Sequence, residues 1–186
     1  VGVAERGHTV ATFLTGYDGT RKIFDIYRKK AAECGHEVTP DKLAYAGLVY
    51  TGETDEEGRA GAEKLLWYIS ANKVPGHFST PPGYLPQAAR VLAMQGHSSP
   101  LDHKGRSLDE LIDRGVVFAG SPDTVHEQIT RFHERVGGFG HMLNMGQAGF
   151  LDHEETVKGI RIFGQEVLPR IAKLNDAPAE RTASLV

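Results

Sequence analysis

The stretch that decides the fold class is "KLAYAGLVYTGETDEEGRAGAEKLLWYISAN", residues 42–72. It is almost continuously apolar from Leu43 to Tyr50, which is typical of a parallel strand covered on both faces. Thr54 and Glu57 then have the spacing of a helix capping box, so a helix should follow the strand directly. Its predicted inward residues are Ala62, Leu65, Leu66 and Ile69. A strand followed at once by a helix is a βα unit, which predicts an α/β protein with a parallel sheet.

The same alternation recurs on both sides of this unit. Residues 8–14, "HTVATFL", form a predicted strand, and the helix predicted after it spans residues 20–35. Further strands are predicted at "GVVFAG" (115–120) and "GHMLNMG" (140–146), each followed by a helix. The predicted inward residues of these three helices are Ile23, Ile26, Tyr27, Ala31 and Cys34; Val125, Ile129, Phe132 and Val136; and Val157, Ile160, Val167, Ile171 and Leu174.

Residues 73–114 interrupt this rhythm. Residues 73–86 hold four of the nine prolines, which indicates a loop excursion, and short helices are predicted inside it at 87–96 and 107–115. We expect this excursion to shape a substrate pocket as a lid. The rest of residues 1–175 forms one α/β unit, and residues 176–186 form a polar tail.

The expected start of the chain and its small number of strands leave two possible architectures. "VGVAERGH" reads as the end of a helix with Gly7 at its C-cap, so we expect the chain to open inside an element. A complete (β/α)8 barrel takes about 250 residues, whereas this chain of 186 residues offers three or four strands. It is therefore a small open sheet or part of a barrel, and the long excursion favours part of a barrel.

Composition excludes several classes of function. Apolar residues make up 40% and charged residues 24% of the chain, as in ordinary globular proteins. The formal charge of -3 argues against nucleic acid or an anionic membrane as a partner. No apolar run approaches the ~20 residues that span a bilayer. Cys34 is the only cysteine, which favours the reducing cytoplasm, and we expect it to fill space in a helix core.

The stretch "GQAGFLDHEE", residues 146–155, allows three interpretations: a metal site, an acid/base centre or the start of a helix. His153 and Glu154 begin an H-E-x-x-H zinc motif, but Val157 stands where the second histidine must be. Asp152 and Glu155 instead have the spacing of a capping box. The stretch is therefore predicted to be a helix start, and no metal site is predicted.

A phosphate site is considered at "GSPDTV", residues 120–125, because helix N-termini bind anions. Ser121 is a good N-cap and Pro122 suits the first helical position, while Asp123 would repel a phosphate. Here too the structural interpretation is preferred. The histidines lack the spacing of a shared metal site, and we expect them to be surface or hydrogen-bonded residues.

The remaining candidates come from position alone. Ligands of βα barrels bind at the carboxyl ends of the strands. The candidate residues there for cofactor or substrate binding are Tyr17, Tyr50, Gly146 and Gln147. Taken singly, each of them is more readily explained as an ordinary loop residue, and no catalytic residue is predicted.

The order of the motifs resembles the carboxyl-terminal portion of the luciferase-like monooxygenases, the flavin-dependent family that includes bacterial luciferase. The resemblance rests on "AGSPDTV" (119–125), "GQAG" (146–149), "HEE" (153–155) and "EVLPRI" (166–171), in that order. "PPGY" (81–84), "TGETDEEGRA" (51–60) and "AERGHTVATFLTG" (4–16) fit the same register.

The resemblance implies a partial TIM-like barrel of about the last three βα units, with residues 115–120 inside the excursion. It also implies reduced FMN, supplied by a separate reductase, that activates O₂ to oxygenate a small organic substrate; some relatives use F420 instead. Many flavin contacts and the usual catalytic histidine of the family lie on earlier strands, so flavin binding is not expected from this chain alone. The missing amino-terminal half of the barrel or a second copy of the chain should cover the exposed strands. The alternative is a non-catalytic half-barrel that associates with itself.

Overall fold

Four parallel strands form one sheet in the computed structural model, which describes residues 2–71, 103 and 105–176. The strands are β1 (Val10–Phe13), β2 (Leu43–Thr51), β3 (Val117–Gly120) and β4 (His141–Met145). Residues 44–46 of β2 pair with both β1 and β4, so these two strands lie on opposite edges of β2. The α/β class and the parallel sheet predicted from the sequence are therefore confirmed.

The short strand β3 lies in the sheet and not in the excursion. It pairs with Leu48 to Thr51, the last four residues of β2, beyond the point where β1 ends. The resemblance placed these residues in the excursion, and that placement is wrong. Gln128 of the following helix donates to the carbonyl oxygen of Ala119 at 3.0 Å and accepts from its N–H at 2.9 Å. This side chain thereby satisfies main-chain groups of β3 as a neighbouring strand would.

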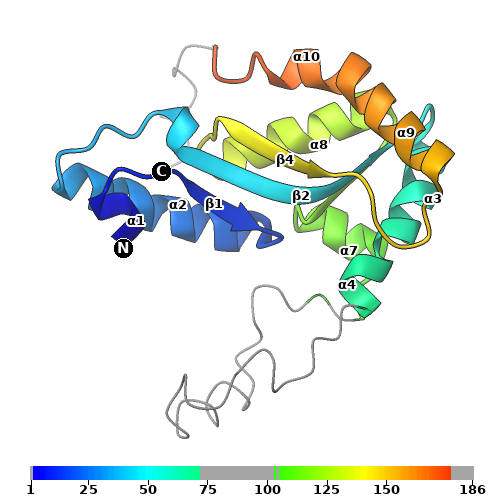
Figure 1. Ribbon diagram of the computed structural model, residues 1–186, viewed down its shortest axis with the longest axis horizontal. Coiled ribbons are helices and arrows are strands. Elements are labelled where there is room, and N and C mark those ends of the chain that lie inside the picture. Colours follow the sequence, from blue (N-terminus) through cyan, green and yellow to red (C-terminus); the bar gives the residue numbers. More distant parts are fainter. Residues whose placement is uncertain (1, 72–102, 104, 177–186) are drawn as a thin grey trace, which may run out of the picture.

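Helices follow the strands as predicted, and the described ones lie along the sheet as shown in Figure 1. They are α1 (Gly2–Glu5), α2 (Gly16–Glu33), α3 (Asp55–Leu65), α4 (Trp67–Ala71), α7 (Leu108–Asp113), α8 (Pro122–Arg135), α9 (His153–Ile162) and α10 (Leu168–Ile171), with a 3₁₀ turn at Pro40–Lys42 and a π-helical turn at Phe163–Val167. The predicted caps Thr54, Ser121 and Asp152 each accept the expected main-chain N–H. The single helix predicted after β2 is divided into α3 and α4.

The chain begins in a helix, as predicted. After α1, Gly7 adopts φ of 64°, and its N–H donates to the carbonyl oxygen of Ala4 at 3.1 Å. The helix predicted at 107–115 is present as α7, whereas the helix predicted at 87–96 lies outside the described residues.

The inward stripe predicted for α2 is partly wrong. Its buried residues are Gly16, Tyr17, Thr20, Phe24, Tyr27 and Ala31. Ile26 is 49% exposed, Ile23 is also exposed, and Cys34 is exposed and not a core residue. Apolar residues lie on both sides of this helix, so the stripe cannot be phased from hydrophobicity alone; contact with the sheet selects the side that holds the aromatic rings.

The prediction for the last helix is also partly wrong. Thr156, Gly159, Phe163 and Val167 are buried, whereas Ile160 is exposed and Val157 is half-buried. Residues 163–167 form a π-helical turn, which holds more residues than a turn of α-helix. Gly159 faces inward because the ring of Tyr50 on β2 lies against α9 at this point.

The two faces of the sheet differ. On one face, the ring of Tyr45 packs against Phe132 of α8 with centroids 4.2 Å apart, and its hydroxyl donates to the carbonyl oxygen of Gly115 at 2.7 Å. Burial raises the pKa of this tyrosine. Val125, Ile129, Phe132 and Val136 of α8 are buried against this face, as predicted. On the other face, Leu48 and Tyr50 at the carboxyl half of β2 are buried against α3 and α9, whereas Phe13 of β1 and Leu143 of β4 are exposed.

Candidate functional site

Short, hydrogen-bonded turns follow the strands at the carboxyl edge of the sheet. Leu14 follows β1 with a positive φ of 51°, which is rare for a non-glycine residue. Its N–H donates to the carbonyl oxygen of Ala46 at 3.0 Å, and its own carbonyl oxygen accepts from Nε2 of buried His103 at 2.7 Å. His103 thus ties the end of the excursion to the end of β1.

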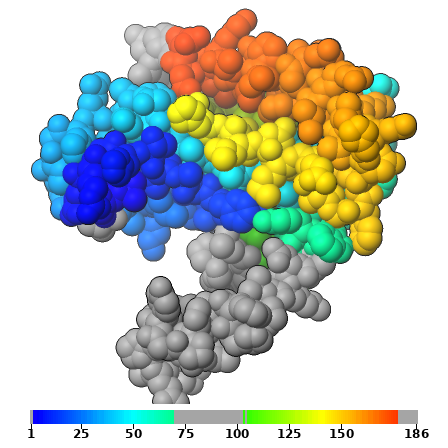
Figure 2. Space-filling model, viewed as in Figure 1, coloured from blue at the N-terminus to red at the C-terminus, as the bar shows by residue number. Residues whose placement is uncertain are grey.

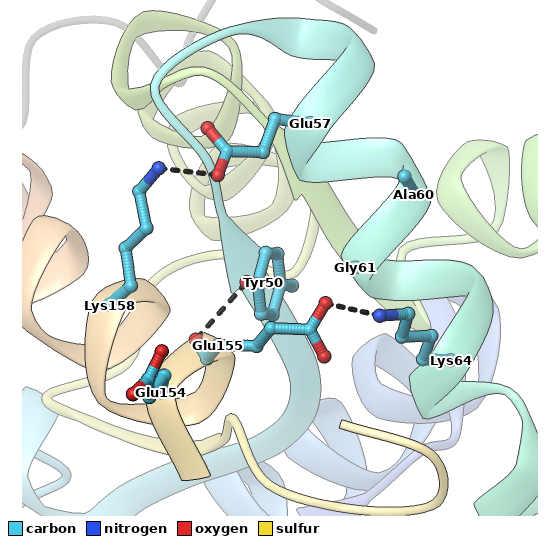
Figure 3. Close-up of a pocket in the computed structure, with 8 residues that line it drawn as sticks. All are labelled: Tyr50, Glu57, Ala60, Gly61, Lys64, Glu154, Glu155 and Lys158. Carbon is cyan, nitrogen blue, oxygen red and sulfur yellow. Dashed lines mark hydrogen bonds and ion pairs between the residues drawn. The ribbon is translucent and has the colours of Figure 1, made fainter. Parts of the chain in front are cut away.

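A groove of about 270 Å³ lies between α3 and α9, over the end of β2 (Figure 3). It is lined by Tyr50, Glu57, Ala60, Gly61, Lys64, Glu154, Glu155 and Lys158. Four of these side chains form ion pairs across the groove. Lys158 Nζ lies 2.6 Å from Glu57 and 3.3 Å from Glu53, and Lys64 pairs with Glu155.

These ion pairs determine the electrostatics of the groove. The hydrogen bond from Lys158 holds the pKa of the Glu57 carboxyl below its ordinary value, and the same bond raises the pKa of Lys158. Each lysine of the groove is thus matched by a carboxylate. The lining residues include no serine, cysteine or histidine, and Tyr50 and both lysines form hydrogen bonds or ion pairs within the groove. We interpret it as the contact between two helices.

Tyr50 forms the floor of that contact. Its hydroxyl donates to the main-chain carbonyl oxygen of Glu155 at 3.1 Å. A β-carbon built on Gly61 would lie 2.2 Å from the Tyr50 ring, and one built on Gly159 would lie 2.9 Å from it. The two glycines therefore let α3 and α9 close over the ring from both sides. Burial, and next the charge of Glu155, raises the pKa of Tyr50.

The helix N-termini along this edge are the places where a flavin phosphate could be expected to bind. The N–H of Ser121, at the start of α8, donates to the carboxylate of Asp55 from α3 at 2.7 Å. This bond lowers the pKa of Asp55, so the anion is present at neutral pH. The N–H of Glu53 before α3 donates to the carboxylate of Glu57, and the N–H of Asp152 before α9 donates to that of Glu155. Carboxylates thus occupy the starts of α3, α8 and α9, and these residues do not fit a flavin phosphate.

The four residues predicted for a ligand pocket lie in different places. Tyr17 is buried between α2 and α8, with its ring centroid 5.1 Å from that of Phe132 and the guanidinium of Arg135 4.0 Å above the ring. Tyr50 lines the groove between α3 and α9. Gly146 is buried just after β4 and Gln147 is exposed beside it. The structure does not bring Tyr17 and Tyr50 to one cavity.

Histidine contacts, metal sites and membrane-spanning helices can be assessed for the described ranges 2–71, 103 and 105–176. His126 Nδ1 lies 3.1 Å from Arg170, and His133 Nε2 lies 3.0 Å from Asn175, as expected of hydrogen-bonded histidines. Within those ranges, no group of three or more His, Cys, Asp and Glu side chains has the arrangement of a metal site. No helix there is long and apolar enough to cross a membrane. His77 and His97 lie outside the described residues.

Sequence reasoning missed the groove and the link from His103 to Leu14. Glu57 and Lys158 are 101 positions apart, and His103 and Leu14 are 89 positions apart, so no spacing rule joins them. The capping box at Glu155 was visible, but its pairing with Lys64 needed the packing of α9 on α3.

A parallel sheet whose strands lead into capped helices, with its turns gathered at the carboxyl edge, defines a parallel α/β protein. A model of the luciferase-like monooxygenase family matches residues 3–137. This match covers more than half of the chain, which therefore belongs to the luciferase-like monooxygenase family, as the resemblance indicated.

Two curated relatives are much longer than this chain. It is 27% identical to 3,6-diketocamphane 1,6-monooxygenase of Pseudomonas putida over 177 residues, which are 90% of this chain and 42% of the relative. It is 24% identical to limonene 1,2-monooxygenase of Rhodococcus erythropolis, with 86% of this chain and 36% of that protein covered. The chain thus spans well under half the length of these relatives.

Solved structures agree on the fold. The oxygenating constituent of 3,6-diketocamphane monooxygenase from Pseudomonas putida, a type II Baeyer-Villiger monooxygenase in complex with FMN, matches with a TM-score of 0.63 and 24% identity. The match covers 90% of this chain and 44% of that one. Coenzyme F420-dependent tetrahydromethanopterin reductase from Methanopyrus kandleri matches with a TM-score of 0.53 and 16% identity, over 90% and 46% of the two chains.

Proposed function

We propose that this chain is the carboxyl-terminal part of a flavin-dependent monooxygenase and supplies about the last three βα units of its barrel. The observation that carries the proposal is the family match over residues 3–137, combined with a parallel sheet that exposes Phe13 and Leu143 on one face. In a barrel that face points inward and is filled by side chains of the remaining strands. The lone cysteine, Cys34, suits a reducing cytoplasm, where we place the protein.

The cofactor we propose for the whole protein is reduced FMN supplied by a separate reductase. An FMN complex of a structural relative supports FMN over F420, although an F420-dependent enzyme shares the fold. When bound, flavin would supply the redox chemistry with O₂. Because Asp55 and the capping glutamates occupy the starts of α3, α8 and α9, the phosphate would be held elsewhere than at these three helix starts.

The substrate class we propose is a small cyclic organic molecule of low polarity. The names of the two curated relatives refer to diketocamphane and limonene. The described part of this chain would contribute an apolar wall, since Phe13 and Leu143 are exposed on one face of the sheet. Gly146 and Gln147 would border the pocket at the end of β4, and residues 73–114 would complete it.

For Tyr17 and Tyr50 we propose an indirect role in that pocket. The hydroxyl of Tyr50 is bonded to Glu155, and the ring of Tyr17 is stacked in the core. Both therefore hold the loops at the carboxyl edge in place rather than present a polar group to a ligand.

The test replaces the corresponding carboxyl-terminal part of 3,6-diketocamphane 1,6-monooxygenase with this chain. We expect the chimera to sediment as a folded protein and to perturb the visible spectrum of FMN, and we expect residues 1–186 alone to leave that spectrum unchanged. Circular dichroism and thermal unfolding separate a folding failure from a binding failure. A folded chimera without FMN binding, or micromolar FMN binding by the chain alone, contradicts the proposal.

The second candidate is a non-catalytic half-barrel that associates with itself. The exposed apolar side chains of Phe13 and Leu143 favour it, because a second copy could cover them without any cofactor.

A further inference from the structure

We propose that His126 makes a pH-sensitive contact that holds the carboxyl-terminal helix α10 on α8 at neutral pH and releases it when the imidazole is protonated. The contact lies within this chain and involves no flavin, so the proposal is independent of the function proposed above. It assigns different roles to the two histidines of α8, His126 and His133.

These two histidines attach the segment around α10 to α8. Nδ1 of His126 lies 3.1 Å from Nη2 of Arg170, a residue of α10. Nε2 of His133 lies 3.0 Å from Oδ1 of Asn175, beyond the end of α10. The histidines are seven positions apart, which is about two turns of helix, so they lie on the same side of α8. Figure 1 shows α10 beside α8.

The contact of His126 exists in one protonation state only. A guanidinium group carries N–H donors and has no acceptor, so Nδ1 of His126 must accept the hydrogen bond from Arg170 with its lone pair. A protonated imidazole carries N–H on both nitrogens and a positive charge. Protonation therefore removes the acceptor and places a second cation beside Arg170.

The contact of His133 is kept in both protonation states. The side-chain nitrogen of Asn175 donates to the carbonyl oxygen of Phe139 at 3.1 Å, which leaves Oδ1 of Asn175 as the acceptor. Nε2 of His133 must therefore donate, and it bears a proton in this neutral form as well as in the charged form. Acidification should weaken the attachment at His126 and leave that at His133 in place.

The surroundings of His126 favour its neutral form at pH 7. Burial, and next the charge of Arg170, lowers the pKa of His126, and Asp123 opposes this shift. Arg170 also pairs with Asp123 at 2.7 Å, but the Asp123 side chain is 91% exposed, so water screens that ion pair. Once His126 is protonated, the screened pair is a weak attachment for α10.

The other elements packed on α8 add no charge at His126. β3 has no ionisable side chain. Glu166 of the π-helical turn has no hydrogen bond, ion pair or charge interaction with His126. Arg28 of α2 contacts the opposite end of α8, at the carbonyl oxygens of residues 136–138. Among the described residues, Arg170 and Asp123 are thus the charged groups that face His126.

The attachment of α10 is local enough for one contact to matter. The helix spans four residues, and its Pro169 cannot donate a main-chain hydrogen bond. Figure 2 shows this part of the chain, in red-orange, on the outside of the molecule. Short exposed elements near the end of a chain open at a lower free energy than the core. Loss of the His126 contact should therefore open this segment before the sheet unfolds.

The first experiment measures hydrogen exchange of the native chain at pH 7.5 and pH 5, with rates corrected for the intrinsic effect of pH. The amide of Ala172, which donates to Leu168, reports opening of the segment, and the amide of Leu48, which donates to Val116, reports opening of the sheet. Because the folded state lowers the pKa of His126, its neutral form stabilises the closed segment above 6.5, and this contribution is lost as the pH falls.

We expect the protection of Ala172 to fall at least about three-fold at pH 5 and that of Leu48 to stay constant. No loss at Ala172, or an equal loss at both amides, overturns the proposal.

The second experiment repeats this measurement on two variants. His126→Asn keeps an acceptor near the position of Nδ1 but cannot be protonated, so the pH effect on Ala172 should disappear. His133→Gln is the matched control, because it keeps a donor near the position of Nε2 and should leave the pH effect in place. Circular dichroism checks that both variants fold. A pH effect that survives in His126→Asn, or that disappears in both variants, overturns the proposal.

The third experiment does not depend on opening of the segment. Proton NMR follows the titration of the His126 ring in wild type and in Arg170→Met. Because the guanidinium disfavours the charged imidazole, we expect the pKa of His126 to rise in Arg170→Met. An unchanged pKa would show that Arg170 does not act on His126 and would overturn the proposal.

Discussion

The ring of Tyr50 and the backbone of Gly61 are in such close contact that a β-carbon on Gly61 would lie 2.2 Å from the ring. No side chain fits between α3 and β2 at this point. The glycine is therefore a packing requirement of the βα unit rather than a flexible joint.

Gly61→Ala should destabilise the chain by about 2 kcal/mol or more, because the added methyl group forces the Tyr50 ring or α3 to move. Gly164→Ala is the control: Gly164 has no atom within 4 Å of a built β-carbon. Because Gly164 lies in a helical turn, alanine at this position should leave the stability unchanged or raise it by up to about 1 kcal/mol. Urea unfolding of both variants measures the difference. Equal stabilities would contradict the packing described for Tyr50.

Tyr50→Phe should cost about 1 kcal/mol at pH 7, because the carbonyl oxygen of Glu155 loses its donor. The raised pKa of Tyr50 adds a pH dependence. A tyrosine that ionises later in the folded state stabilises folding below pH 10 and loses that contribution as the pH rises above 10. The difference between wild type and Tyr50→Phe should therefore shrink above pH 10. A difference that is constant from pH 7 to 11 would argue against burial of this hydroxyl.

Asp55→Ala should destabilise the chain at pH 7 by about 1 kcal/mol, the usual cost of losing a side-chain acceptor at a helix start. The N–H of Ser121 lowers the pKa of Asp55, so the carboxylate stabilises folding above its ordinary value of 3.8. That contribution is lost as the pH falls below 3.8. The difference in unfolding free energy between wild type and Asp55→Ala should be smaller at pH 3 than at pH 7. Asp113→Ala, at the end of α7, should not change stability at pH 7.

Asp152→Ala should cost about 1 kcal/mol through loss of the capping box at the start of α9, whereas Asp152→Ser should retain most of the stability. The residues Asp152–Glu155 form no metal group, so EDTA should leave the melting temperature unchanged. A drop in melting temperature with EDTA, reversed by zinc, would restore the metal interpretation of this stretch.

Cys34 should react with a thiol reagent in the native protein, because it is exposed after α2. We expect one equivalent per chain without denaturant, since the sequence holds one cysteine. Reaction only after unfolding would indicate that the thiol is buried.

The described elements predicted best from the sequence were those governed by local rules. The strands β1, β2 and β4 and the caps Thr54, Ser121 and Asp152 follow from neighbouring residues, because capping and strand burial patterns act over a few positions. The stripe of α8 was also right, because its apolar residues lie on one side only. The stripe of α2 was wrong at Ile23 and Ile26, since that helix has apolar residues on two sides.

The candidate site was predicted only in outline. Tyr17 and Tyr50 both follow or end a strand, so position alone made them equivalent. In the structure, Tyr17 packs on Phe132 of α8 and Tyr50 lies between α3 and α9. Their neighbours come from helices that are distant in the sequence, so no local pattern separates the two tyrosines.

The sequence by itself determined the α/β class, the helix starts and the membership of a family whose motifs stand in order along the chain. Each of these depends on interactions between residues close in the chain, or on the order of short motifs. Only the tertiary structure decided that β3 joins the sheet, that α3 and α9 close over Tyr50, and that Phe13, Ala46 and Leu143 are neighbours across three strands. Those contacts join residues up to about a hundred positions apart, and only the packing of the whole sheet selects among the many pairs that the same local patterns allow.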